Sequence, residues 1–104
     1  MANKKLSYEL SQEADNDLGE IFDYSAEKFG IDQAIIYLSG FEEVFENLCA
    51  NPESGRIRSE LREQLRSFSH ESHVVFYRII ESRIRIVRIL HASRDLIRFL
   101  PPQD

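Results

Sequence analysis

Three strand-like runs in the last third of the chain constrain its fold more than any other feature. Two short polar breaks, residues 69–72 and 81–83, separate these runs and leave no room for a helix between them. Consecutive strands joined by such short breaks pair as antiparallel hairpins. The sequence therefore predicts an antiparallel meander built from residues 65–68, 73–79 and 84–90.

The first half of the chain predicts a short strand followed by a helix. Residues 5–10 alternate polar and apolar side chains, which is the pattern of a half-buried strand that would lie beside the meander. Ser11 is a candidate N-cap, and Gly30 is expected to end the helix that Ser11 begins. Apolar or small residues at helical spacing form the expected inward face: Ala14, Leu18, Ile21, Ser25 and Phe29.

A second helix is expected over residues 32–50. Only residues 29–31 separate it from the first helix, so the two should fold back as an αα-hairpin with both apolar faces on the sheet. Its inward face is predicted to be Ala34, Leu38, Phe41, Phe45 and Leu48. More apolar side chains remain than one face requires, and these are candidates for a groove that binds a partner: Phe22, Ile35, Ile36, Tyr37 and Val44.

Two segments complete the predicted architecture. Residues 57–64 fit either a loop or one helical turn, and residues 92–100 predict a short C-terminal helix closed by two prolines. A chain of 104 residues is long enough for one core, so residues 1–104 are expected to form a single domain. The predicted class is α+β: an N-terminal strand, an αα-hairpin packed on an antiparallel β-sheet meander, and a short C-terminal helix.

Charge is divided unevenly along the chain. Residues 1–53 carry 12 acidic residues against 3 lysines, whereas residues 54–104 carry 10 arginines, 6 acidic residues and no lysine. Arginine alone suits bidentate recognition of carboxylate or phosphate, although strands that simply expose arginine to water would give the same count. The acidic first half argues against indiscriminate nucleic-acid binding, so no direct, specific nucleic-acid partner is expected.

Several classes of protein are disfavoured by what the sequence lacks. The single cysteine, Cys49, has no partner within the chain, which favours a reducing cytosol and a buried thiol. There is no apolar run of about 18 residues and no charged-then-apolar leader, so a cytoplasmic protein is expected. The four glycines form no phosphate-binding pattern, so no nucleotide cofactor is expected.

Metal binding and carboxylate chemistry are also disfavoured. His70 and His73 are three residues apart, but they fall in a strand and its turn, where residues three apart are expected to point to opposite faces. Without a cysteine or a third clustered ligand, the sequence predicts no metal site. The helical carboxylates are interpreted as solvated faces rather than as a general acid–base pair.

A set of residues in fixed order follows the expected elements through nearly the whole chain: Leu10, Ser11, Ala14, Asp17, Leu18, Ile21, Tyr24, Phe29, Gly30, Gln33, Ala34, Tyr37, Asn51, Pro52, Gly55, Arg56, Leu65, Arg66, Ser67, Phe68, His73, Phe76, Tyr77, Arg78, Ile89, Leu90, His91, Arg94 and Asp95. In this order and spacing the chain resembles the ParE/RelE superfamily of bacterial toxins, and most closely its ParE branch. The resemblance implies the toxin of a type II toxin–antitoxin pair. It also implies a cognate antitoxin that wraps the toxin with an extended, partly disordered segment.

The resemblance leaves the target to be decided, because ParE members are taken to poison DNA gyrase and RelE members to cut mRNA on the ribosome. The nuclease pattern is incomplete here: His73 and Val74 stand where nucleases often carry an arginine, and Ile97 stands where they carry a tyrosine. We therefore expect a gyrase inhibitor that acts by binding, not an enzyme. A ribosome-dependent mRNA endonuclease and a non-toxic antitoxin-binding module are the alternatives.

Two groups of candidate site residues follow from this interpretation. The arginine-rich sheet edge and terminal helix would contact gyrase through Arg78, Arg88, His91, Arg94 and Arg98. The apolar groove beside the helical hairpin would hold the antitoxin near Phe22, Tyr37 and Phe41. Arg94 has an alternative role, which is to pair with Asp95 or with an acidic residue of the helices. The expected assembly is a hetero-oligomer with the antitoxin, without cofactor, metal or membrane.

Overall fold

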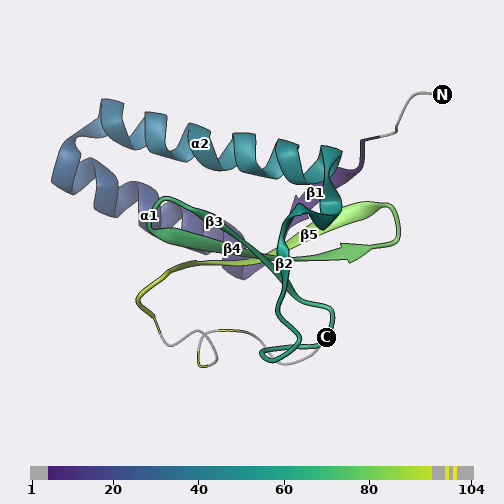
Figure 1. Cartoon of the computed structure of the whole chain (residues 1–104). Helices are drawn as coiled ribbons and strands as arrows, with labels where there is room; N and C mark the ends of the chain where they lie inside the picture. Colours follow the sequence, from purple (N-terminus) through teal and green to yellow (C-terminus); the bar gives the residue numbers. More distant parts are fainter. Residues whose placement is uncertain (1–4, 95–97, 99, 101–104) are drawn as a thin grey trace.

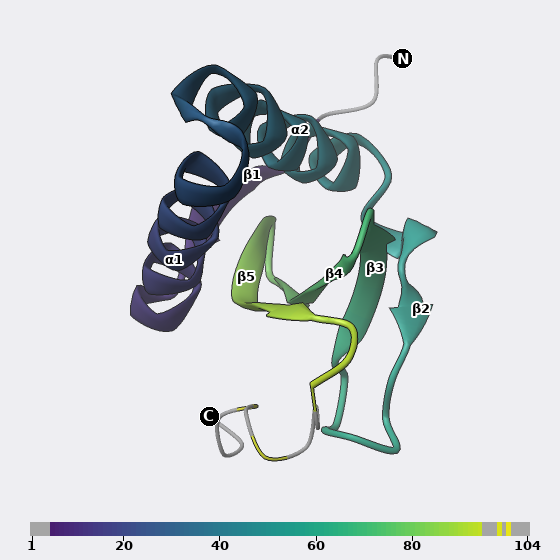
Figure 2. The same ribbon diagram turned by 90° about the vertical axis from the view of Figure 1, so that its left-hand side faces the viewer.

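The computed structural model describes residues 5–94, 98 and 100, and these residues form two layers (Figures 1 and 2). Two antiparallel helices make one layer, and within the described residues a five-stranded sheet makes the other. The elements follow the chain as β1 (Ser7–Leu10), α1 (Gln12–Phe29), α2 (Ile31–Ala50), the 3-10 helix η1 (Pro52–Ser54), β2 (Arg56–Ile57), β3 (Arg66–His70), β4 (His73–Ile80) and β5 (Arg83–His91). The predicted α+β class is confirmed.

The sheet has the strand order β1-β5-β4-β3-β2. β3, β4 and β5 form the predicted antiparallel meander, and β1 lies beside it, as predicted. β1 pairs with β5 in parallel, from Ser7 opposite Arg83 to Leu10 opposite Ile86. Parallel neighbours need a long crossover between them, and the helical hairpin provides part of that connection here.

The segment between η1 and β3 is a loop that begins with a strand the sequence did not predict. β2 has two residues and pairs with β3 at the edge of the sheet. Residues 58–64 then form turns, with the Arg58 N–H donating to the Leu65 carbonyl at 2.7 Å. Of the two possibilities left open for residues 57–64, the loop is therefore confirmed.

The helical hairpin agrees with its predicted caps. The Ser11 hydroxyl accepts a hydrogen bond from the Ala14 N–H at 3.0 Å. Gly30 ends α1 with φ at +94°, a conformation that favours glycine, and its N–H donates to the Ala26 carbonyl at 2.9 Å. Gly30 alone separates the two helices, so the connection is shorter than the three residues predicted.

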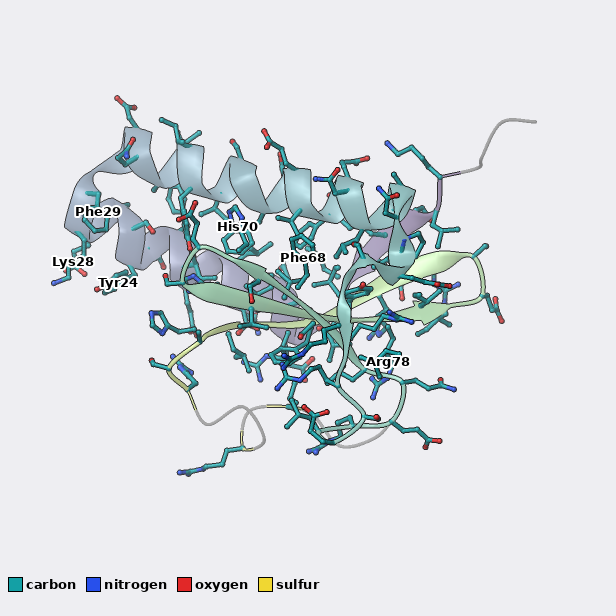
Figure 3. The ribbon with its side chains drawn as sticks, viewed as in Figure 1. Tyr24, Lys28, Phe29, Phe68, His70 and Arg78 are labelled. Atoms are coloured by element: carbon teal, nitrogen blue, oxygen red, sulfur yellow. The ribbon has the colours of Figure 1, made fainter. Side chains whose placement is uncertain are left out.

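Two predictions about the faces of the hairpin were wrong. Phe29 was assigned to the inward face but is 69% exposed. Figure 3 shows it with Tyr24 and Lys28 at the turn of the hairpin, away from the sheet that would bury it. Val44 was a candidate groove residue, but it is 6% exposed and belongs to the core.

Among the described residues the core consists of two apolar clusters, one on each face of the sheet. The cluster between helices and sheet contains the largest set: Ala14, Ile21, Phe41, Val44, Phe45, Leu48, Cys49, Val75, Tyr77, Ile84, Ile86 and Ile89. The second cluster contains Leu65, Val74, Phe76, Val87, Leu90 and Leu100. Val74 to Tyr77 alternate between the two clusters, as successive residues of a strand do. Cys49 is buried as predicted, and this burial raises the pKa of its thiol.

Part of the predicted C-terminal helix can be compared with the structure. Ala92 and Ser93 form a turn, so the helix does not begin at residue 92. Arg98 is helical, whereas residues 95–97, 99 and 101–104 lie outside the described part of the chain. Neither α1 nor α2 has the continuous apolar length that a membrane span needs.

A buried tyrosine fixes the connection between α2 and β2. The Tyr77 hydroxyl donates to the Pro52 carbonyl at 2.7 Å and accepts from the Gly55 N–H at 2.9 Å. Tyr77 itself is fully buried. A Cβ atom at position 55 would overlap the Tyr77 ring and lie 2.9 Å from the Ser67 carbonyl oxygen. Only glycine therefore fits at this close approach.

Gly55→Ala should lower the free energy of unfolding by about 1–3 kcal/mol, because the added methyl group must displace Tyr77 or the backbone of β3. Gly19→Ala is the matched control, since nothing lies within 4 Å of a Cβ placed there. In the exposed middle of α1 this change should stabilise the protein by about 0.5–1 kcal/mol. Urea unfolding of both variants measures the difference. Equal effects would contradict the close packing described for Gly55.

Candidate functional site

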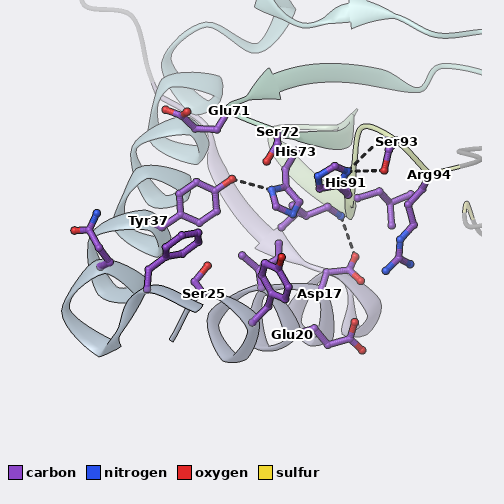
Figure 4. Close-up of a pocket in the computed structure, with 16 residues that line it drawn as sticks. Asp17, Glu20, Ser25, Tyr37, Glu71, Ser72, His73, His91, Ser93 and Arg94 are labelled. Carbon is purple, nitrogen blue, oxygen red and sulfur yellow. Dashed lines mark hydrogen bonds between the residues drawn. The ribbon is translucent and has the colours of Figure 1, made fainter. Parts of the chain in front are cut away.

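A cleft of about 930 Å³ opens between the helical hairpin and the end of the sheet (Figure 4). α1 and α2 form one side, and the β3–β4 turn, the end of β5 and the following turn form the other. Apolar and ionisable side chains share the lining, including Asp17, Glu20, Tyr24, Phe29, Tyr37, Glu71, His73, His91, Ser93 and Arg94. Such a concave surface, apolar with a few convergent polar groups, is typical of a binding site.

Asp17 holds the α1 side of the cleft against β5. Its carboxylate accepts two hydrogen bonds from the Arg88 guanidinium, both 2.8 Å long, and one from the Ile89 N–H at 2.9 Å. The Asp17 side chain is 9% exposed and that of Arg88 is 16% exposed. The hydrogen bond to Asp17 raises the pKa of Arg88 further above its usual range. Asp17 thus satisfies a strand N–H beyond the point where β1 stops pairing with β5.

Ser11 also hydrogen-bonds to the edge of β5. Its N–H donates to the Ile86 carbonyl at 2.9 Å, and its hydroxyl donates to the Val87 carbonyl at 2.7 Å. The residue that caps α1 therefore also binds β5. Together with Asp17, it makes the first turns of α1 take the place of a strand along this part of β5.

A series of polar side chains crosses the cleft from α2 to the turn after β5 (Figure 4). The Tyr37 hydroxyl lies 2.8 Å from Nδ1 of His73. The His73 and His91 rings meet edge to face, with their centroids 5.3 Å apart. Nδ1 of His91 lies 2.8 Å from the Ser93 hydroxyl and accepts from the Ser93 N–H at 3.1 Å. α2, β4 and β5 are thereby linked through their side chains.

His73 and Tyr37 both favour their neutral forms. The pKa of His73 is lowered from 6.5 to about 4, mainly by burial and also by the nearby His91, His70 and Arg94. The negative charge of Asp17 acts in the opposite direction but is weaker. Burial also raises the pKa of Tyr37. At neutral pH His73 is therefore an uncharged imidazole bonded to an uncharged phenol.

The structure corrects the expected placement of His70 relative to His73. The two residues pair directly across the β3–β4 hairpin, because the turn at residues 71–72 reverses the chain. They therefore share one face, and both rings contact Tyr37 and Phe41. Within the part of the chain that the structure describes, no three His, Cys, Asp or Glu side chains are placed to hold a metal ion.

The predicted target-binding residues separate into different environments. His91 and Arg94 are exposed and line the cleft, and Arg98 is exposed but does not line it. Arg88 is held by Asp17, and Arg78 is 7% exposed on the side of the sheet opposite the helices (Figure 3). Neither Arg78 nor Arg88 thus presents an exposed guanidinium to a partner, which corrects their assignment.

The predicted antitoxin-binding residues also lie in different environments. Tyr37 is half-buried and lines the cleft, whereas Phe22 is half-buried outside it. Phe41 has no exposed surface, so it supports the cleft from the core and cannot contact a partner directly. The structure therefore brings Tyr37 together with His91 and Arg94, which the sequence had placed in two separate sites.

Sequence reasoning missed His73 and Asp17 as members of the site. His73 was considered as a metal ligand and as a departure from the nuclease pattern, but not as part of a binding cleft. Asp17 was counted among solvated acids, yet it lies on the same helical face as Ala14 and Ile21, three residues after the first and four before the second. A carboxylate on an inward face is a signal for a buried ion pair, and that signal was available in the sequence.

Asp17→Ala should lower the free energy of unfolding by about 3 kcal/mol. The change leaves the mostly buried Arg88 guanidinium and the Ile89 N–H without their acceptor, and uncompensated buried groups are costly. Urea unfolding measures the loss. Asp23→Ala, which removes an exposed acid from the same helix, should change stability by less than about 0.5 kcal/mol. A similar loss in both variants would show that helix charge, not the contact with β5, is responsible.

Stability should fall as the pH is lowered from 6.5 towards 4. The folded state keeps His73 neutral down to a pKa of about 4, so between these values the unfolded state binds more protons. The full shift corresponds to at most about 3 kcal/mol, and screening of a half-buried group reduces the expected loss to about 1–2 kcal/mol. Urea unfolding across this range checks it. His73→Gln should flatten the pH dependence; an unchanged slope in that variant would assign it to other groups.

The two-layer arrangement is similar to solved toxin–antitoxin structures. The chromosomal ParDE system from P. aeruginosa superposes with a TM-score of 0.75 at 22% sequence identity, covering 86% of this chain and 98% of that one. The RelBE2 toxin–antitoxin complex from Mycobacterium tuberculosis gives a TM-score of 0.55 at 18% identity, covering 85% and 99%. The protein therefore has the fold of the ParE/RelE superfamily.

Sequence comparison identifies the branch of that superfamily. Residues 8–96 match the family described as the ParE toxin of the type II toxin–antitoxin system, parDE. Toxin ParE1 of Mycobacterium tuberculosis is 39% identical over 94 residues, which cover 89% of this chain and 96% of that protein. Toxin ParE1 of Caulobacter vibrioides is 37% identical over 88 residues, which cover 85% and 91%. The chain belongs to the ParE toxin family, as the resemblance in its sequence predicted.

Proposed function

We propose that this ParE toxin inhibits DNA gyrase by protein–protein binding in the cytoplasm and is neutralised by a cognate antitoxin. The match of residues 8–96 to the ParE family carries the proposal, because inhibition of gyrase is the activity that the resemblance implied. The toxin would act by occupying a surface of gyrase, so no bond is made or broken by the toxin itself.

The exposed basic side chains near the end of β5 are the candidate gyrase contacts. His91 and Arg94 lie at the rim of the cleft, and Arg98 is exposed shortly after them in the chain. Arginine at such a position can make bidentate hydrogen bonds to carboxylates of a protein partner. Arg78 and Arg88 are not included, because their side chains are buried or held by Asp17.

An antitoxin is the second proposed partner. Two solved structures with this fold are described as toxin–antitoxin systems or complexes, which supports a comparable partner for this chain. The cleft beside Tyr37 is the proposed antitoxin site, and it replaces the groove near Phe22 and Phe41. The antitoxin and the toxin would then form a hetero-oligomer.

Ribosome-dependent mRNA cleavage is a second candidate function. One observation favours it: Tyr37, His73, His91 and Arg94 converge on one cleft, and such groups can act on a phosphodiester. Two features weigh against it. His73 is neutral and hydrogen-bonded to Tyr37 at physiological pH, and the sequence after residue 53 contains no lysine to bind RNA phosphates.

A pulse of toxin expression in a bacterial culture tests these functions. Incorporation of labelled thymidine and labelled methionine is followed over the first minutes. Gyrase inhibition predicts that DNA synthesis falls before translation, whereas mRNA cleavage predicts the reverse order. If neither falls, the chain is a non-toxic binding module and the proposal is wrong.

The double variant His91→Ala with Arg94→Ala locates the surface in the same assay. It should delay the fall in DNA synthesis at equal toxin levels, because it removes two of the three exposed contacts. Arg56→Ala is the matched control, since it removes an exposed arginine from β2 at the opposite edge of the sheet. Unchanged toxicity in the double variant would exclude His91 and Arg94 as gyrase contacts.

A further inference from the structure

The hydrogen bonds around His91 fix which nitrogen carries its proton. The Ser93 backbone N–H donates to Nδ1 of His91 at 3.1 Å, so Nδ1 must act as an acceptor. In a neutral imidazole the proton is then on Nε2. His91 is exposed and lines the cleft, so it offers an Nε2–H donor there.

His73 can take the same tautomer through its contact with Tyr37. Burial raises the pKa of the Tyr37 hydroxyl, so the phenol keeps its proton at neutral pH. A hydroxyl proton that Tyr37 donates to Nδ1 of His73, 2.8 Å away, gives this tautomer. His73 is then protonated on Nε2 as well. Two imidazole donors, with ring centroids 5.3 Å apart, therefore belong to one end of the cleft.

The other end of the cleft is apolar and continues onto the tip of the hairpin. Tyr24 and Phe29 line the cleft, yet they are 60% and 69% exposed. Three further large apolar residues near the turn are also exposed: Ile31, Ile35 and Ile36. Exposed apolar side chains of this kind, next to a polar end, are typical of a surface that a protein partner covers.

Arg94 lines the cleft beside His91 and is exposed, so its positive charge favours an acidic group at the histidine end. Asp17 already accepts from Arg88 and Ile89, so its charge is compensated. Glu20 and Glu71 also line the cleft, but both are exposed, so water screens them. The pKa of His73 is lowered mainly by burial, and the nearby His91, His70 and Arg94 lower it in the same direction.

We propose that the cleft holds one segment of the cognate antitoxin in which a bulky apolar side chain lies next to an aspartate or glutamate. The apolar side chain would lie against Tyr24 and Phe29. The carboxylate would accept hydrogen bonds from Nε2–H of His73 and of His91. The inference rests on the proposed antitoxin partner and adds the chemistry by which that partner is recognised.

A pair of small probes tests this site without the antitoxin. N-acetyl-L-phenylalanine carries an aromatic ring and a carboxylate, and N-acetyl-L-phenylalaninamide carries the same ring without the charge. Titration of the purified toxin at pH 7.5, followed by NMR of the imidazole nitrogens, should give a Kd of about 1 mM for the acid. The amide should bind about fivefold more weakly, because it lacks the charge-assisted hydrogen bonds. The acid should shift the Nε2 signals of both His73 and His91.

Variants assign the effect to the imidazole donors. His91→Ala should remove the preference for the acid over the amide, and the exposed position of His91 makes loss of the fold an unexpected result. His91→Asn keeps a donor and should retain part of the preference. Arg56→Ala should retain all of it. Equal binding of the two probes by the wild-type protein would overturn the proposal, and so would tighter binding of inorganic phosphate, which would indicate a nucleic-acid site.

A last titration tests the occupant itself. Toxin co-purified with the product of the adjacent antitoxin gene should no longer bind N-acetyl-L-phenylalanine. Binding that persists in this complex would show that the antitoxin does not fill the cleft. None of these measurements involves gyrase, so a failed gyrase assay and a failed carboxylate site give distinguishable results.

Discussion

The structure depends on one carboxylate that joins its two layers. Asp17 on α1 accepts hydrogen bonds from the side chain of Arg88 and from the backbone N–H of Ile89. It therefore attaches the helix to both a side chain and the backbone of β5. A buried ion pair stabilises a fold only when its remaining hydrogen-bonding capacity is used, and three donors to one carboxylate meet that condition. The position of α1, and with it one whole side of the cleft, follows from this contact.

The elements of the fold could be predicted from the sequence because their patterns are local. Alternation identified residues 5–10, short polar breaks identified the meander, and helical spacing with Ser11 and Gly30 identified α1. β2 was missed because two residues cannot show a period. Phe29 was misplaced because periodicity assigns a face to a helix but does not say where the sheet beneath it ends.

The site was harder to predict because it depends on contacts between distant elements. Tyr37, His91 and Arg94 were each identified, but only the folded hairpins show that they share a cleft. Arg78 and Arg88 were selected for their charge, and composition cannot distinguish an exposed guanidinium from one that a carboxylate holds. The two histidines of β3 and β4 were misjudged because the strand rule was applied across a turn.

The attachment of α1 to β5 has a consequence for the thermodynamics of recognition. One side of the cleft is held by Asp17 and Ser11, and the other is cross-linked from Tyr37 through His73 to the end of β5. A cleft with both sides fixed before binding loses little conformational entropy when it is filled. The entropy lost on association then belongs almost entirely to the partner, so a segment that is already ordered in solution should bind more tightly than a flexible one of the same composition.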